Sequence, residues 1–417
     1  MTEPLTERVD NPGRASWTPW RAVVWFGVVS LLADMVYEGA RSMYGPLLAS
    51  LGASALLVGL VTGAGEAMAL VLRLVFGPLA DRSGRYWTLT IAGYGLTCVS
   101  VPLLAVSPFV GSAGLALAVV LILLERTGKA VRSPSKTTLL ARVAAQVGRG
   151  RGFGVHKAMD QTGAFLGPLL VAGVVAVSGA IWAGMLVLAI PGIAAMAVLL
   201  WVRVMVPRVD LDEPVQPARP EERRGWFSDA VGAHLPRTFF LYATAASLTT
   251  GGLVTFGVIS YHLAVEDLVP VAVVPVIYAG AMLAEALAAL VVGWLYDRVS
   301  TRVLYAVPVL VALVPPLALS GRLGVVLVGV AVWGFAFGLQ DSSIKALVAE
   351  LVEPARHATA YGVFAAVQGI TAVAGGALVG WLYGTSLTAL VVVVAGIQVV
   401  ALVLLVVTLR RARPVVA

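Results

Sequence analysis

Long apolar runs, separated by short polar turns, recur along almost the whole chain. A helix needs about 20 apolar residues to cross the hydrocarbon core of a bilayer, where helices satisfy their own backbone groups. The pattern predicts an all-α integral membrane protein with twelve transmembrane helices. We place them at about 20–48, 54–79, 87–107, 112–140, 153–178, 180–204, 236–263, 268–296, 301–320, 323–349, 358–384 and 385–409.

One long polar segment, residues 205–235, interrupts this pattern near the middle of the chain. It combines several prolines with acidic and basic residues, a composition typical of an extended linker. It predicts two six-helix halves, 20–204 and 236–409. Residues 1–19 and 410–417 are interpreted as polar tails, and the first tail has no signal-peptide pattern.

Composition supports a membrane protein and narrows the chemistry. The chain is 59% hydrophobic and 12% charged, with a mean hydropathy of +0.92, whereas soluble proteins carry about 25% charged residues. A single cysteine, Cys98, excludes a disulfide framework. No histidine and cysteine set has the spacing of metal ligands, and no phosphate-binding loop is present. We expect no metal and no cofactor.

The net charge of +7 does not predict nucleic-acid binding, because the arginines gather at alternate turns between the apolar runs. In membrane proteins this asymmetry marks the cytoplasmic side. We therefore expect both termini and the segment 205–235 to be cytoplasmic, in a protein of the cytoplasmic (inner) membrane.

A charged turn follows the second apolar run and reads Gly77-Pro78-Leu79-Ala80-Asp81-Arg82-Ser83-Gly84-Arg85. A weaker copy, Gly293-Trp294-Leu295-Tyr296-Asp297-Arg298, follows about half a chain later. Both resemble the signature loop of the major facilitator superfamily, which usually adds a basic residue where this chain has Tyr86. The resemblance implies two similar halves that rock about a central site. It assigns conformational gating to Gly77, Asp81, Arg82, Gly84, Arg85, Asp297 and Arg298.

In the fifth apolar run, Gly163-x-x-x-Gly167-Pro168 resembles the antiporter motif of exporting members of that family. The family pattern continues with two glycines, where this chain has Val171 and Ala172. The resemblance implies an exporter and a gating role for Gly163, Gly167 and Pro168. Small residues at this spacing also allow close helix packing, and both readings can hold together.

Ionisable residues inside membrane spans are costly and therefore candidates for function. Asp34, Glu38 and Arg41 share one helical face. Two carboxylates one turn apart resist ionising together, so one can exchange protons near neutral pH. The alternative is a static network in which Arg41 neutralises one acid.

The fourth and fifth spans add further candidates. Arg126 and the small residues after it resemble a recurrent family pattern linked to proton coupling or substrate contact. His156 and Asp160 are one turn apart and can form either a proton-exchanging pair or a packing pair. The proton-coupling candidates are Asp34, Glu38, Arg126, His156 and Asp160. The substrate-binding candidates are Tyr37, Arg41, Glu66, Lys129, Trp333, Gln340 and Gln368.

The chain is thus predicted to be a secondary transporter and not an enzyme. We expect proton-coupled efflux of a small organic or amphiphilic molecule by a monomer, with protons and membrane lipid as its other partners. An importer or facilitator of an organic anion is the alternative, favoured by Arg126, Lys129 and Arg132. A lipid-handling membrane enzyme is a weaker one, since we find no nucleophile and base set.

Overall fold

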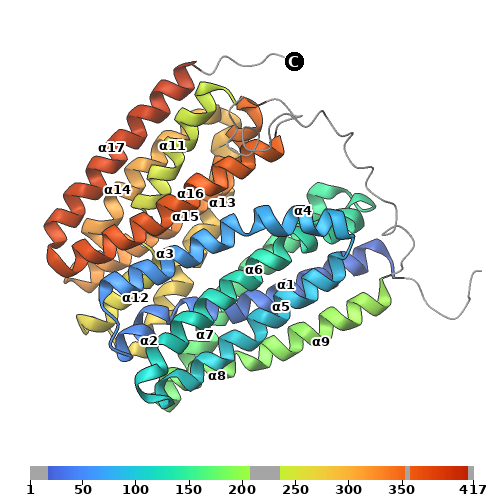
Figure 1. The fold of residues 1–417 in the computed structure, drawn as a ribbon, viewed down its shortest axis with the longest axis horizontal. Helices are drawn as coiled ribbons and strands as arrows, with labels where there is room; N and C mark the ends of the chain where they lie inside the picture. Colours follow the sequence, from blue (N-terminus) through green and yellow to red (C-terminus); the bar gives the residue numbers. More distant parts are fainter. Residues whose placement is uncertain (1–16, 207–234, 353–356, 412–417) are drawn as a thin grey trace, which may run out of the picture.

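The computed structural model describes residues 17–206, 235–352 and 357–411. Within these ranges the regular structure is helical throughout, without strands, which confirms the predicted fold class. The helices form two groups that lie side by side, coloured blue to green and yellow to red (Figure 1). The predicted tails and the linker fall largely outside the described residues.

The first group contains residues 19–205. Its α-helices are α1 (Pro19–Arg41), α2 (Tyr44–Ser50), α3 (Ala55–Val71), α4 (Arg73–Ser83), α5 (Tyr86–Leu103), α6 (Gly114–Ala145), α7 (Arg149–Ser178), α8 (Ile181–Val187) and α9 (Ala189–Met205). Three predicted spans are each built from two helices, α1–α2, α3–α4 and α8–α9. Each of the six predicted spans therefore matches one helix or one such pair.

The second group contains residues 237–411. Its α-helices are α11 (Arg237–Gly252), α12 (Phe256–Val265), α13 (Val274–Val299), α14 (Ala306–Ala318), α15 (Leu323–Leu351), α16 (His357–Thr385) and α17 (Leu387–Arg411). Here α11 and α12 together form one predicted span. Each other α-helix matches one.

Eleven of these spans are long and apolar enough to cross a membrane by length and composition, counting only the described residues. The twelfth is α6, which is equally long but carries several charges. It packs against α5, α3 and α7, and Glu125, Arg126 and Arg132 are buried inside the bundle. Their burial against protein rather than lipid explains how so polar a helix can span a membrane.

The halves meet most closely along α3 and α16, and also where α2 packs against α12 and α7 against α13. On the α3–α16 seam a Cβ atom added at Gly59 would overlap the carbonyl oxygen of Gly376. Only glycine allows the two backbones to approach so closely. Thr62 and Thr255 share a hydrogen bond of 2.8 Å between the halves near this seam.

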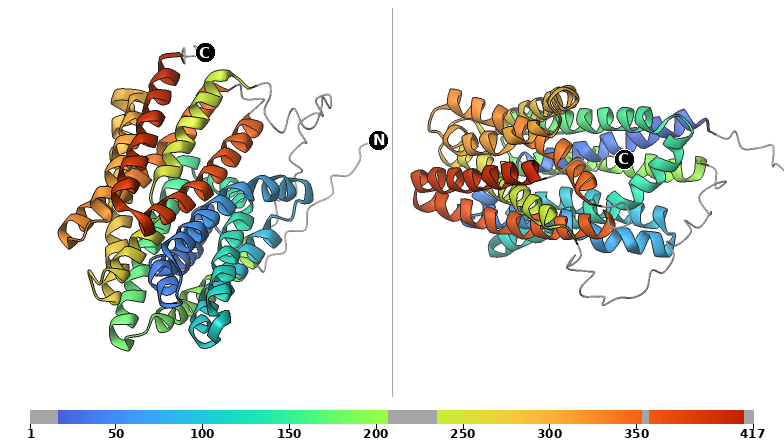
Figure 2. Two further views of the ribbon diagram at one scale, coloured as in Figure 1. Left: turned by 60° about the vertical axis from the view of Figure 1, so that its left-hand side comes forward. Right: turned by 90° about the horizontal axis from the view of Figure 1, so that it is seen from above.

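Helix α1 begins and helix α17 ends at the same end of the bundle, which we call the terminal end. We call the opposite end the far end. The close contacts of Gly59 lie towards the far end. Towards the terminal end the two groups diverge, with the end of α9 well apart from the start of α11 (Figure 1). The left view of Figure 2 shows the same separation from another side. The central cavity lies between the groups.

Candidate functional site

The cavity between the halves has a volume of about 350 Å³. It is lined by α1, α3, α4, α6 and α7 from the first half and by α11, α13, α15 and α16 from the second. Six basic and five acidic side chains line it: Arg41, Arg73, Lys129, Arg132, Lys136, Lys157, Asp34, Glu38, Glu66, Asp160 and Glu285. All except Glu285 come from the first half, so the two walls differ strongly in charge.

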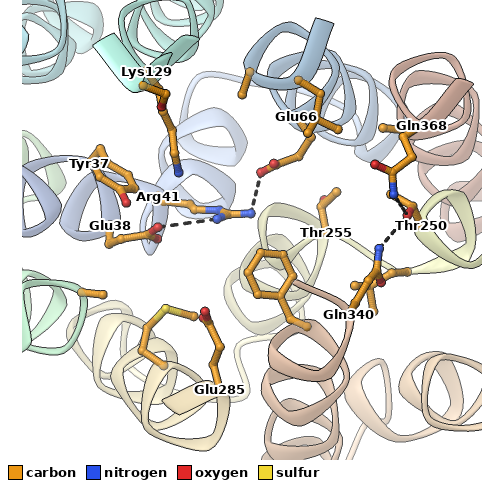
Figure 3. Close-up of a pocket in the computed structure, with 18 of the residues that line it drawn as sticks. Tyr37, Glu38, Arg41, Glu66, Lys129, Thr250, Thr255, Glu285, Gln340 and Gln368 are labelled. Atoms are coloured by element: carbon orange, nitrogen blue, oxygen red, sulfur yellow. Dashed lines mark hydrogen bonds and ion pairs between the residues drawn. The ribbon is translucent and has the colours of Figure 1, made fainter. Parts of the chain in front are cut away.

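A network of polar and charged side chains is centred on α1 and extends to α3 of the same half and to α13 of the second half. Tyr278 of α13 donates a short hydrogen bond to Glu38, across the boundary between the halves. Arg41 lies 3.7 Å from Glu38 (Nη1 to Oε1) and 2.6 Å from Glu66 of α3 (Nη2 to Oε1) (Figure 3). Tyr278 and Glu38 are buried, so water screens these interactions little.

Behind Glu66 the network extends to side chains of α6. Arg126 lies 3.8 Å from Glu66 (Nη1 to Oε1) and 3.0 Å from Glu125 (Nε to Oε2). The hydroxyl of Tyr44 donates to Glu125 at 3.4 Å. With Arg41, Tyr44 and Glu66, Arg126 lines a void of only about 10 Å³.

These contacts correct one expectation about Arg126. The family resemblance linked Arg126 to proton coupling or substrate contact, which would place it in the cavity. Instead, Arg41 is the guanidinium beside Glu38, while Arg126 lies behind the cavity wall between Glu66 and Glu125. The reason is helix rotation, because Arg126 is on the side of α6 that packs against α3.

Lys129 and Arg132 line the cavity one and two turns further along α6. The ammonium of Lys129 lies 4.2 Å from the centre of the Tyr37 ring. The side chains of Lys129 and Tyr37 both extend into the space shown in Figure 3. Arg132 packs its guanidinium over the rings of Tyr37 and Tyr94 and donates to Thr97 at 2.6 Å.

A second polar group lies nearer the terminal end, between α1, α6 and α7. His156 Nδ1 is 3.4 Å from Asp160 Oδ2, and Lys136 Nζ is 2.9 Å from Ser30 Oγ. Asp34 interacts electrostatically with both Asp160 and Lys136. The structure thus places the predicted pair, His156 and Asp160, near Asp34. Asp34 and Asp160 line the cavity, whereas His156 lies behind it.

The second half contributes Glu285 and a group of uncharged hydrogen-bonding side chains. Gln340 and Gln368 donate their amide groups to the same oxygen, Thr250 Oγ1, at 2.6 and 3.1 Å. Thr250 itself donates to the carbonyl of Ala246 at 3.0 Å. Both predicted glutamines therefore line the cavity and are held by a threonine that we did not single out.

Trp333 lines the cavity but is 1% exposed, and its ring is tied into the second half. Its Nε1 donates to the carbonyl of Val254 at 2.7 Å, and it stacks on Phe337 at 5.3 Å. Arg41 lies over the Phe337 ring from the other half, at 5.6 Å. These contacts give Trp333 a packing role that supports the wall.

The predicted gating turn lies at the terminal end. Asp81, Arg82 and Arg85 are exposed, and Gly84 ends α4 with a left-handed φ of 63°. Asp81 accepts a hydrogen bond of 3.1 Å from Tyr86, the residue that replaces the family's additional basic position. Gly77 lies near Pro134 of α6.

In the weaker copy of the turn, Arg298 is exposed in the last turn of α13. The side chain of Asp297 lies outside the described part of the structure.

The Gly163-x-x-x-Gly167-Pro168 segment of α7 packs directly on α1. Cβ atoms added at Gly163 and Gly167 would overlap the carbonyl oxygens of Leu31 and Met35. These positions lie one on each side of Asp34 in sequence. The close-packing reading is therefore realised, and it places the motif beside a proton-coupling candidate.

Sequence reasoning missed Tyr278 and Thr250, and it did not select Lys136 as a candidate. Neither a tyrosine nor a threonine inside an apolar run carries a distinctive sequence signal. Lys136 was visible as a lysine in a predicted span, a position that is costly without a partner. No group of three or more histidine, cysteine, aspartate or glutamate side chains suited to a metal is found among the described residues.

Two helical groups around a central polar cavity are the architecture of secondary transporters. A sequence model of the Major Facilitator Superfamily matches residues 26–282 and 255–417. The chain belongs to this superfamily, and the predicted family membership is confirmed.

Among relatives, an uncharacterized protein of Mycobacterium tuberculosis (strain H37Rv) is 49% identical over 395 residues, 94% of each chain. An uncharacterized MFS-type transporter of Methanocaldococcus jannaschii is 30% identical over 149 residues, 36% of each chain.

Two solved structures share the fold. The nucleoside transporter NupG has a TM-score of 0.71 at 15% identity, covering 93% of this chain and 99% of that chain. A POT family transporter in complex with 5-aminolevulinic acid has a TM-score of 0.70 at 14% identity, covering 94% of this chain and 96% of that chain.

Proposed function

We propose that this transporter exports a small polar organic molecule in exchange for protons, with Glu38 as the residue that links proton binding to the movement of the halves. The observation that carries the proposal is the bond from Tyr278 to Glu38. Glu38 belongs to the first half and Tyr278 to the second, so this bond lasts only while the two halves meet at this place.

Ionised Glu38 is stabilised here by two groups. A carboxylate is favoured by a hydroxyl that donates to it and by a nearby guanidinium, and Tyr278 and Arg41 supply these. When the halves part on this side, the hydroxyl is withdrawn and proton binding becomes more favourable. A swing of this kind makes a carboxylate take up a proton in one state and release it in the other.

The proposed direction of transport takes its support from the orientation and from one motif. With the terminal end in the cytoplasm, as the arginine distribution favours, the present state has its halves apart towards the cytoplasm. In the proposed exporter, this state releases a proton inwards and admits substrate from the cytoplasm. The packing of Gly163 and Gly167 on α1, in a motif resembling that of exporters, supports the same direction.

Purified protein in proteoliposomes tests the coupling. An imposed pH gradient should drive proton flux that increases when an exported substrate is present, read by an internal pH-sensitive dye. Glu38→Gln should abolish gradient-driven transport while substrate exchange without a gradient partly survives. Full gradient-driven transport by Glu38→Gln would exclude Glu38 as the coupling residue, and Asp34 with Asp160 would be the next site to test.

An organic-anion importer or facilitator is the second candidate. It is favoured by Lys129, whose ammonium has no carboxylate within 4.0 Å among the described residues. Proteoliposomes separate the two candidates, because an importer accumulates substrate with a proton gradient directed inwards, and an exporter expels it.

A further inference from the structure

The opposing walls of the cavity offer different chemistry to a bound molecule. The first half presents ten of the eleven charged residues, and the second half presents Glu285 and the amides of Gln340 and Gln368 beside Thr250 (Figure 3). A substrate that spans the cavity therefore meets charge at one end and neutral hydrogen-bonding groups at the other.

Most basic groups of the first wall are already engaged. Arg41 is held between Glu38 and Glu66, Arg132 donates to Thr97, and Lys136 bonds to Ser30. Arg73 and Lys157 have interactions of their own.

Lys129 differs from these residues. Within the described ranges no carboxylate oxygen lies within 4.0 Å of its ammonium, which rests on the face of Tyr37 at 4.2 Å, and Glu38 and Glu66 attract it only from beyond ion-pair distance. An ammonium has three donors, and a ring face leaves most of them available. An anionic group would complete them, because charge-assisted hydrogen bonds are the strong ones.

The opposite wall offers acceptors, and Thr250 is the reason. The hydroxyl hydrogen of Thr250 is used on the carbonyl of Ala246, so its oxygen can only accept from the two glutamines. Both amides therefore turn their nitrogen towards Thr250 and their oxygen away from it. Gln340 Oε1 is buried and has no hydrogen-bond partner in the described structure.

A buried acceptor without a partner is costly, since a lost hydrogen bond is not replaced by water. Gln368, with 9% exposure, turns its amide oxygen towards the cavity in Figure 3. A hydroxyl or N–H group on a bound molecule would satisfy the cavity-facing oxygen of Gln368, and a small rotation of the Gln340 amide would let its buried oxygen accept from the same molecule. A second anionic group would be repelled by them.

We propose that the substrate is an organic anion that carries a hydrogen-bond donor at its other end, with Lys129 binding the anionic group and the amide oxygens of Gln340 and Gln368 accepting from the donor. This inference rests on the proposed function only in taking the central cavity as the substrate site. It is independent of proton coupling and of transport direction.

The probes are ω-hydroxyalkanoates of four to ten carbons, each compared with the alkanoate that lacks the hydroxyl and the diol that lacks the carboxylate. Binding is measured by isothermal titration calorimetry on the full-length protein in nanodiscs. We expect a preferred chain length, which reports the span between the two walls. At that length the hydroxy acid should bind about 3- to 10-fold more tightly than the alkanoate, the range of one neutral hydrogen bond.

Variants separate the two subsites. Lys129→Gln should weaken hydroxy acid and alkanoate alike by about 10-fold or more, as expected for a charge-assisted bond, and should leave the diol unchanged. Lys129→Arg should restore most of the affinity. Gln340→Leu or Gln368→Leu should leave the alkanoate unchanged and abolish the preference for the hydroxyl.

Gln398→Leu is the matched control, because Gln398 is a buried glutamine of the second half that bonds to the Leu248 carbonyl and lies outside the cavity lining. Thermal unfolding of each variant checks its folding. The inference is overturned if no chain length binds, if Lys129→Gln binds acids like the parent, or if the hydroxyl preference survives both cavity glutamine variants. Binding as expected without proton-driven transport would refute the proposed coupling alone.

Discussion

Replacing Tyr278 by phenylalanine tests whether Glu38 links the two halves. The substitution removes one hydroxyl and retains the ring, which packs at 4.4 Å from Phe256 and near Trp333. The lost contact is the hydrogen bond to Glu38. A hydrogen bond to a charged group contributes about 1.5–3 kcal/mol.

That energy is present only in the state in which the halves meet at Tyr278. The variant should therefore move the equilibrium between this state and the state open at the far end by about 10- to 150-fold, since about 1.4 kcal/mol corresponds to a factor of ten. Double electron–electron resonance can follow this shift with spin labels at Ser112 and Thr388, which are exposed at the far end of each half. We expect the longer distance to gain population.

Tyr383→Phe is the matched control. Its hydroxyl also lies near the far end and pairs with His262 at 2.8 Å, but both residues belong to the second half. Loss of the Tyr383 hydroxyl should lower the free energy of unfolding without changing the distribution of distances between the spin labels. Equal distributions for the parent and Tyr278→Phe, or an equal shift in Tyr383→Phe, would refute the reasoning.

The bond between Tyr278 and Glu38 also predicts that pH changes the conformation of the protein. Protonation of Glu38 replaces the charge-assisted bond to Tyr278 by a neutral one, which is about half as strong. Acidification should therefore populate the far-end-open state in the parent. In Tyr278→Phe the response should be smaller, and in Glu38→Gln it should be absent. An unchanged response in Glu38→Gln would assign it to another group.

Three further predictions address the seam, the topology and the charged turn. Gly59→Ala places a methyl group against the carbonyl oxygen of Gly376. The overpacking costs about 1–3 kcal/mol and should favour the far-end-open state. A distance distribution identical to the parent's would contradict this. A cysteine at Pro217 in a Cys98→Ala background should resist an impermeant thiol reagent in intact cells and react after lysis, whereas labelling from outside would overturn the cytoplasmic assignment. Asp81→Asn should shift the halves towards the terminal-end-open state and reduce turnover without loss of folding, and unchanged interhalf distances would exclude a gating role.

The sequence by itself was sufficient for the membrane spans. Periodicity and span length are local properties, and lipid permits few structures other than helices. Each predicted span therefore matches one helix or one pair of helices, with small differences at the ends. The charged turn and the shared face of Asp34, Glu38 and Arg41 were also readable, because a helix fixes the relation between residues three and four apart.

The tertiary structure alone decided which charged groups meet. It joined Glu38 to Tyr278 of the other half, and it placed Arg126 behind the cavity wall between Glu66 and Glu125. Such contacts depend on the rotation of each helix about its axis and on the docking of one half against the other. No local pattern encodes these quantities, so Tyr278 in an apolar run carries no sign of its partner 240 positions away.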